Sequence, residues 1–137
     1  MFDQAHFIDG ALAFLLAFGL ACLFLVVFKY LYQAVTPYDE RALIRDGNVA
    51  AAVTLGGAII GFALPVASAL SHTDGMAEFA AWALLAGVIQ IVAFVVLSKV
   101  VVKDLDVRIG RGDVSTAVYL AATSIAIGLI NAASMTY

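Results

Sequence analysis

Charged residues are scarce in this chain. Asp, Glu, Lys and Arg make up 12% of its 137 residues, whereas hydrophobic residues make up 64%. A soluble domain is usually about 25% charged and about half apolar, and a small one buries only about two thirds of its surface. The composition therefore excludes an ordinary soluble domain. We expect lipid as the main solvent and no nucleic-acid partner.

Cysteine is almost absent, since the single residue, Cys22, lies inside an apolar run. One cysteine builds neither a disulfide framework nor a cysteine-based metal site, so we interpret Cys22 as a packing or lipid-facing residue. The N-terminal segment carries Asp3 and Asp9 and lacks the basic residues that open a signal peptide. We therefore do not expect this segment to be a cleaved signal sequence.

Four long apolar runs occupy most of the chain, over residues 10–35, 49–71, 77–102 and 114–137. Each reaches the roughly 20 residues that a helix needs to cross the hydrocarbon layer of a membrane. The short connections make consecutive helices antiparallel neighbours. The sequence therefore predicts an all-α membrane protein, with four transmembrane helices in a single domain over residues 1–137.

The basic residues are confined to two of the three connections. All seven lie in or beside residues 36–48 and 103–113: Lys29, Arg41, Arg45, Lys99, Lys103, Arg108 and Arg111. Positively charged connections stay on the cytoplasmic side. We therefore expect both termini on the opposite side. The positions of Tyr32 and Tyr38 fit an aromatic belt at the cytoplasmic interface, and that of Tyr137 fits the outer one.

The two halves of the chain align when the sequence is shifted by 65 residues, which places Asp39 on Asp104 and Gly47 on Gly112. Each half, about 10–71 and about 77–137, would be a helix, a charged turn and a second helix. Two spans per unit give both units the same orientation. We therefore predict that two parallel two-helix repeats form the fold, related by an axis along the membrane normal.

The two charged turns carry matching candidate residues, which combine glycines with residues that favour helix N-caps. They are Asp39, Glu40, Gly47, Asn48, Asp104, Gly112 and Asp113. Asn and Asp accept hydrogen bonds from the free N–H groups of a helix start, so capping is the favoured interpretation of Gly47-Asn48 and Gly112-Asp113. A solvated charged loop is the favoured interpretation of the other acidic residues. The alternatives are a polar entrance whose helix N-termini attract anions, and an acidic and basic docking surface for a cytoplasmic partner.

Two local expectations concern the same turns. In the first, Thr36 is expected to cap a short helix that has Pro37 at its first position. In the second, Leu105, Val107 and Ile109 alternate with charged residues. This segment could lie flat at the membrane surface or pair as a short extended strand.

Small residues recur at four-residue spacing in the second and fourth apolar runs. The candidates for close helix packing are Gly56, Gly57, Gly61, Ser124, Gly128 and Ala132. Helices in lipid associate through such residues, because their backbones can then approach closely. We therefore expect these two helices to form the inner, packed pair. The motif does not distinguish packing within one chain from packing between copies.

Polar residues inside the apolar runs are few. The candidates are Thr54, Ser68, Gln90 and Asn131. They could bridge helices by hydrogen bonds, which we prefer, or line a pore. No Asp or Glu lies deep in any run, which argues against ion-coupled transport. The sequence shows no nucleophile–base set, phosphate loop or diagnostic metal-ligand spacing, so we expect no enzyme, no cofactor and no metal site.

Residues 38–61 carry a family resemblance. The acidic pair Asp39-Glu40, then Gly47-Asn48 with alanines, then Gly56, Gly57 and Gly61, resemble the pattern of the domain-of-unknown-function 350 family. This family comprises small bacterial inner-membrane proteins, including YjfL-like proteins. The second copy departs from the pattern, because Asp113 replaces the asparagine. The resemblance implies four spans in the inner membrane, no established activity, and a link to envelope or membrane-stress systems.

The sequence thus leads to two functional hypotheses. The first is a non-enzymatic membrane scaffold that binds a partner membrane protein or further copies of itself. The alternative is a small channel or carrier with a pore lined by the second and fourth helices. Under both hypotheses the protein spans the lipid bilayer, and we expect both of its termini on the periplasmic side.

Overall fold

The computed structural model of the protein describes residues 1–135, and every regular element in this range is helical. The elements are α1 (Gln4–Val35), α2 (Glu40–Arg45), α3 (Val49–His72), α4 (Met76–Val96), the π-helix η1 (Leu97–Val101), α5 (Leu105–Gly110) and α6 (Val114–Ala133). Four segments are long and apolar enough to cross a membrane: α1, α3, α4 with η1, and α6. The predicted all-α fold with four membrane helices is therefore confirmed. Tyr137 lies outside the described residues.

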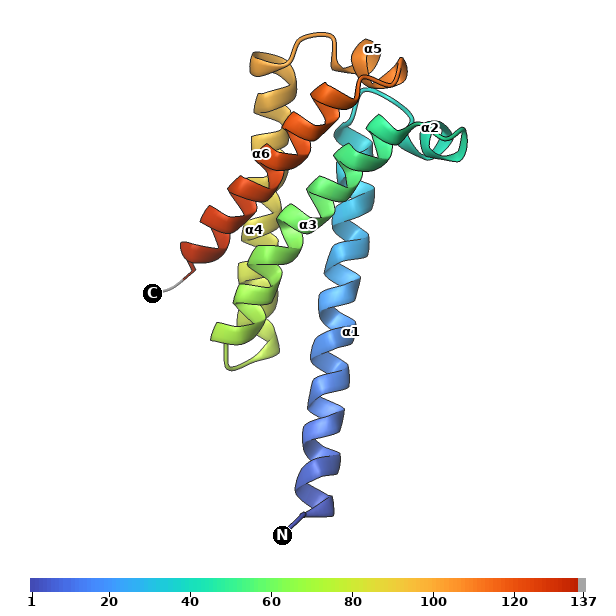
Figure 1. Ribbon diagram of the computed structural model, residues 1–137. Coiled ribbons are helices and arrows are strands. Elements are labelled where there is room, and N and C mark those ends of the chain that lie inside the picture. The colour runs from blue at the N-terminus through green and yellow to red at the C-terminus, as the bar shows by residue number, and fades with distance from the viewer. Residues whose placement is uncertain (136–137) are drawn as a thin grey trace.

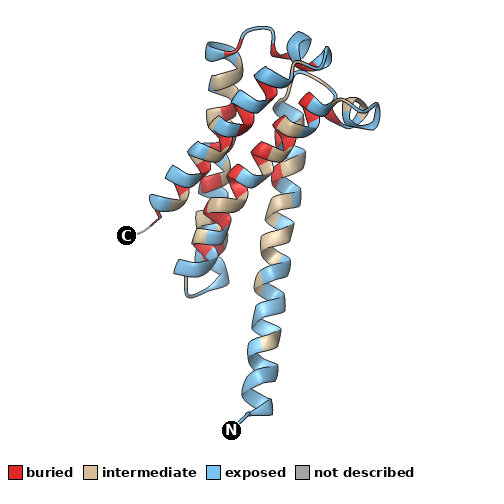
Figure 2. Cartoon of the chain, in the orientation of Figure 1, coloured by how far each residue is buried: buried red, intermediate tan, exposed pale blue. Residues whose placement is uncertain are grey.

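Helix α3 lies at the centre of the bundle. It packs on α6 through the most extensive contact between any two helices, and it also contacts α4 and α1. Figure 1 shows α3 and α6 running side by side, inclined to α1 and α4. Buried residues gather on α3 and α6 (Figure 2), while large parts of α1 and α4 are exposed. The core is thus a helix pair, with two more helices against it.

The short helices α2 and α5 form two hairpins at one end of the bundle (Figure 1), which we call the hairpin end. Each hairpin closes through a glycine at positive φ, Gly47 at +86° and Gly112 at +80°, where other residues would be strained. The next N–H, of Asn48 or Asp113, donates to a carbonyl five residues back, at 2.8 and 2.9 Å. The two turns thus repeat the same bonds. The parallel relation of the two whole halves stays a prediction.

One local expectation for the turns needs correction, and one of two alternatives for the other turn is excluded. Thr36 ends α1 rather than opening a helix, because its hydroxyl donates back to the Gln33 carbonyl at 2.9 Å. Helix α2 begins only at Glu40. The extended alternative for residues 105–109 is also wrong, since they form α5. A helix places Leu105 and Ile109 on one face, and both are buried.

Helix α1 continues past the turn that joins α3 to α4. Ala17 and Leu20 lie beside Thr73, Asp74 and Gly75 of that turn, as lining residues of one pocket. Residues 10–16, which we call the α1 extension, lie beyond this level (Figure 1). All of the extension except Ala11 is exposed. The extension is therefore a length of apolar helix that stands apart from the bundle.

Candidate functional site

The two predicted caps, Asn48 and Asp113, hold helix starts, and Asp39 holds a third. Asp39, Asn48 and Asp113 each accept a hydrogen bond from the backbone N–H three residues later, at 3.2, 3.0 and 3.3 Å. Asp104 does not, although it aligns with Asp39. It has a left-handed backbone, with φ 58°, and makes no side-chain cap bond. Asp104 therefore does not cap α5 with its side chain, because the chain enters α5 through a left-handed residue instead of an extended one.

Asn48 also joins the two hairpins. Its amide nitrogen donates to the Ile109 carbonyl at 2.8 Å, across the space between α2 and α5. Asp113 acts only locally, since its carboxylate accepts from the hydroxyls of Ser115 at 2.7 Å and Thr116 at 2.8 Å. These bonds hold the pKa of Asp113 down at about 2. Both cap side chains thus bond within the chain, which favours capping over an anion entrance.

Removing the Asn48 side chain tests this joint. We expect Asn48→Ala to lower the free energy of unfolding by about 1–3 kcal/mol, because one cap and one interhairpin bond are lost together. Asn48→Asp keeps the cap acceptor but cannot donate to Ile109, so its stability should fall between the two. Unfolding in mixed detergent and SDS measures all three proteins. Equal stabilities would contradict the bridging role.

Glycines bring α3 and α6 into backbone contact. A side chain at Gly57 would overlap Ala121, and one at Gly128 would overlap the carbonyl group of Gly61. A side chain at Gly61 would meet the Ser124 carbonyl oxygen at 2.5 Å. Gly56 differs from the other predicted packing residues, because a side chain there would meet nothing within 4 Å. Gly56 therefore lies outside the close contact, on another face of α3.

The intramembrane polar residues lie between helices of the same chain. Gln90 of α4 donates to the Ser124 carbonyl at 3.3 Å, and Asn131 of α6 donates back to Ala86 of α4 at 3.2 Å. The Ser68 hydroxyl donates to the Ala132 carbonyl at 3.0 Å, which joins α3 to α6. Thr54 bonds within its own helix, to Ala50 at 2.8 Å. Each of these four side chains thus makes a hydrogen bond within the bundle, although the side-chain oxygen of Gln90 has no partner among the described residues.

A buried acidic group at the hairpin end was missed by the sequence analysis. Glu40, expected in a solvated turn, is only 2% exposed, and Tyr32, expected in an aromatic belt, is 1% exposed. Both carboxylate oxygens and the hydroxyls of Tyr32 and Tyr38 are buried, and none has a hydrogen-bond partner among residues 1–135. A shallow pocket lined by Glu40, Tyr38, Gln33, Asp39 and Arg41 lies beside them.

Burial governs the ionisation of Glu40. It raises the pKa of the Glu40 carboxyl from 4.5 to about 7, because the charged form loses its hydration. The polar side chains of Tyr38, Tyr32 and Gln33 and the charge of Lys29 act the other way, but more weakly. Burial and the nearby Glu40 also raise the pKa of the Tyr38 hydroxyl. The group can therefore change its charge near neutral pH.

The signal that could have found this cluster is the grouping Tyr32, Tyr38 and Glu40 within nine positions. The sequence pattern alone placed each of them at a wet interface. Only the fold-back of residues 36–39, which carries α2 against α3, turns Glu40 inward. Without knowledge of that fold-back, an acidic residue next to a capping aspartate is interpreted as an exposed surface charge.

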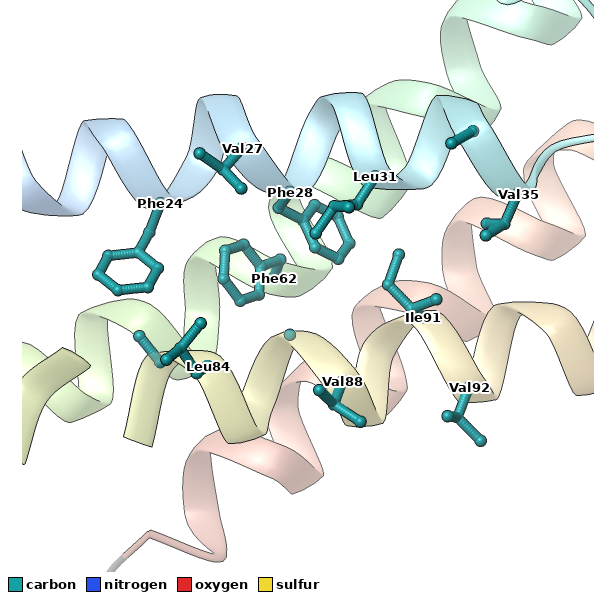
Figure 3. A pocket seen from close by; sticks show the side chains of 13 residues that line it. Phe24, Val27, Phe28, Leu31, Val35, Phe62, Leu84, Val88, Ile91 and Val92 are labelled. Atoms are coloured by element: carbon teal, nitrogen blue, oxygen red, sulfur yellow. The ribbon is translucent and has the colours of Figure 1, made fainter. Parts of the chain in front are cut away.

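A second hollow faces the membrane between α1 and α4 (Figure 3). This apolar groove of about 310 Å³ has thirteen lining residues, all of them apolar, among them Phe24, Leu31, Leu84 and Val88. Phe62 of α3 forms its floor, and the ring of Phe62 stacks on that of Phe28 with centroids 4.3 Å apart. The groove carries no group that could do chemistry.

The comparisons with known proteins agree with the architecture. The family model described as Domain of Unknown Function (DUF350) matches residues 6–135. The chain is similar to the UPF0719 inner membrane protein YjfL of Escherichia coli strain K12 and to its counterpart in Escherichia coli O157:H7. Each is 28% identical over 132 residues, which cover 96% of this chain and 99% of the relative. No solved structure matches the chain significantly.

Proposed function

The chain belongs to the DUF350 family, and on that premise we propose that it is a non-enzymatic inner-membrane component that acts by binding other membrane-protein chains, first of all further copies of itself. Its relatives are inner membrane proteins. With all seven basic residues in or beside the hairpins, the hairpin end would face the cytoplasm and both termini the periplasm. Such a scaffold fits an envelope or membrane-stress system.

The observation that carries this proposal is the α1 extension. It holds seven consecutive apolar residues, which rise about 10 Å along the helix axis. Leu12, Phe14, Leu15 and Leu16 in it are 55–66% exposed. The polar turn with His72 and Asp74 marks the end of the α3–α4 pair. Along the axis of α1, the extension lies beyond the level of this turn.

The extension and the turn cannot both have their preferred surroundings in one flat bilayer. If the polar turn lies at the membrane surface, the extension stands in water, which is unfavourable for exposed Phe and Leu. If the extension lies in hydrocarbon, His72 and Asp74 are drawn about 10 Å inward, and polar groups there are costly. Tilting α1 offers little relief, because its second half packs on α3 and α4.

Contact between extensions of neighbouring copies resolves this conflict. Copies in one membrane present the extension at the same depth, so a symmetric contact covers both extensions at once. Ala13 and Ala17 lie four positions apart, a spacing that lets helices approach closely in lipid. A second copy is therefore the occupant that we propose, and another membrane protein is the alternative that the experiment must separate.

Cysteine cross-linking tests this contact. In a Cys22→Ser background, single cysteines replace residues 11 to 16 in turn, and the purified proteins are oxidised at low density in liposomes. We expect disulfide dimers that peak with helical periodicity along the extension. Leu129→Cys, on the exposed face of α6, should form none. Equal yields at all positions, or no dimers, would contradict self-association. If the cysteine variants instead cross-linked to a different protein in native membranes, that protein would be the partner, and self-association would be wrong.

The same liposomes test the channel or carrier alternative. The structure offers little support for it, because Ser68, Gln90 and Asn131 each donate a hydrogen bond to a neighbouring helix of the same chain. Glycine contacts also close the space between α3 and α6. We expect no solute flux. A flux that Asn131→Leu abolished would instead establish the pore.

A further inference from the structure

Four oxygen atoms are buried together at the hairpin end: the two of the Glu40 carboxylate and the hydroxyls of Tyr32 and Tyr38. The two hydroxyls lie close to the Glu40 carboxylate and to each other. None has a hydrogen-bond partner in the part of the chain that the structure describes. Buried polar atoms almost always have one. The tyrosine hydroxyls lie within reach of the carboxylate but form no well-aligned bond to it, so a further species among them would satisfy all four oxygens.

The positions of these oxygens are fixed by three separate elements. Tyr32 lies near the end of α1, with its ring packed on Phe94 of α4 at 4.6 Å between centroids. Glu40 is the first residue of α2, held there by the Asp39 cap. Tyr38 lies in the connection between them, near Thr54 of α3. The cluster is therefore built by the fold and is not a feature of one loop.

We propose that Glu40, Tyr32 and Tyr38 form a binding site for a single alkali-metal cation, Na⁺ or K⁺, that enters from the pocket lined by Gln33 and Arg41. Carboxylate and hydroxyl oxygens are hard ligands, which suit such ions. A single carboxylate balances a single positive charge. Divalent ions usually collect more carboxylates than this site offers.

The charge balance of the site calls for a cation. An unpaired buried carboxylate is unfavourable by several kcal/mol, and Glu40 forms no ion pair among the described residues. The charged groups that face it are Lys29 of α1, and Asp39 and Arg41 at the pocket wall. The Lys29 ammonium lies over the Tyr30 ring, 5.6 Å from its centroid. The remaining positive charge must therefore come from outside, as a proton or as a metal ion.

The proton and the metal ion compete for the same carboxylate. Because the folded pKa is raised from 4.5 to about 7, the protonated form stabilises the fold fully below pH 4.5. That contribution is lost as pH rises through about 7. Above this pH the carboxylate is charged, and a bound cation can replace the proton. Cation dependence should therefore appear only on the alkaline side.

Thermal unfolding in nanodiscs of neutral lipid separates these cases. At constant ionic strength, the full chain is melted in NaCl, KCl or N-methyl-D-glucamine chloride, at about pH 8 and at about pH 5.5. At the higher pH we expect an alkali salt to raise Tm by on the order of 5 °C over the organic cation. At the lower pH the three salts should give the same Tm.

Variants assign the effect to the cluster. Glu40→Gln should remove the salt dependence, and Tyr38→Phe should weaken it. Asp106→Asn, in the other hairpin and exposed, should leave it unchanged. If Glu40→Gln fails to fold, ²³Na line broadening by the unmodified chain and by Tyr32→Phe gives the same comparison. Identical Tm values in all three salts at about pH 8 would overturn the proposal, even if Tm still fell with pH, since the proton would then be the sole ligand.

Discussion

Gly128→Val should separate α3 from α6 and give the largest loss of stability of any single change in the membrane region. A Cβ at position 128 would overlap the carbonyl group of Gly61, and backbone cannot move aside as a flexible side chain can. Overpacking of a tight core costs about 1–3 kcal/mol and sometimes more. Here the shift would also strain the Ser68 and Asn131 bonds. We therefore expect about 3 kcal/mol or more.

Steric trapping in bicelles, or unfolding in SDS, measures the loss. Gly56→Val is the matched control, because it makes the same change in α3 at a position where a side chain meets nothing within 4 Å. That variant should unfold like the unmodified chain, apart from a small gain in helix propensity, because valine is a better helix former than glycine. If the two variants lost equal stability, the close contact of α3 and α6 would be wrong.

Phe62→Ala should have the second largest effect. Phe62 is 2% exposed, and its ring fills the floor of the apolar groove between Phe28 and Gly87. Removing a buried Phe from a water-soluble core costs about 3–5 kcal/mol. In lipid the transfer part of this cost shrinks, because the surroundings are apolar in both states, while the lost packing contacts remain. We therefore expect about 2 kcal/mol and a deeper groove.

The control for this change is Phe14→Ala, in the α1 extension. Phe14 is 66% exposed, and its ring stacks only on Phe18 of the same helix, so the same truncation removes no contact between helices. Unfolding of the monomer in detergent should leave Phe14→Ala unchanged and destabilise Phe62→Ala. The opposite order would show that α1 and α4 do not pack over Phe62.

The architecture was predictable because membrane helices obey strong local rules. Long apolar runs, short connections and the caps at Asn48 and Asp113 appear directly in the sequence, and the structure places helices there. The starts of the short helices were harder. Thr36 has the chemistry of a cap at either end of a helix, and Asp104 aligns with Asp39 but adopts a left-handed backbone. Such choices depend on how the hairpins pack.

The candidate site was only partly predictable. Spacing identified the small residues of α3 and α6, but it could not show that Gly56 lies apart from the others. Sequence also identified Gln90 and Asn131 as bridging groups, without their partners. The inward position of Glu40 was not predictable, because burial of a charged residue depends on contacts between α1, α2 and α3. Periodicity in a single helix carries no information on these contacts.

The unlike caps at Asn48 and Asp113 mean that the two hairpins cannot be exchanged. An amide both accepts and donates, so Asn48 reaches across to Ile109, whereas a carboxylate only accepts and keeps to Ser115 and Thr116. An acid at the first position would set its charge against a carbonyl oxygen. An amide at the second would lose one of two hydroxyl donors. The exchange of one amide nitrogen for a carboxylate oxygen thus determines which hairpin can occupy the first half of the chain and which the second.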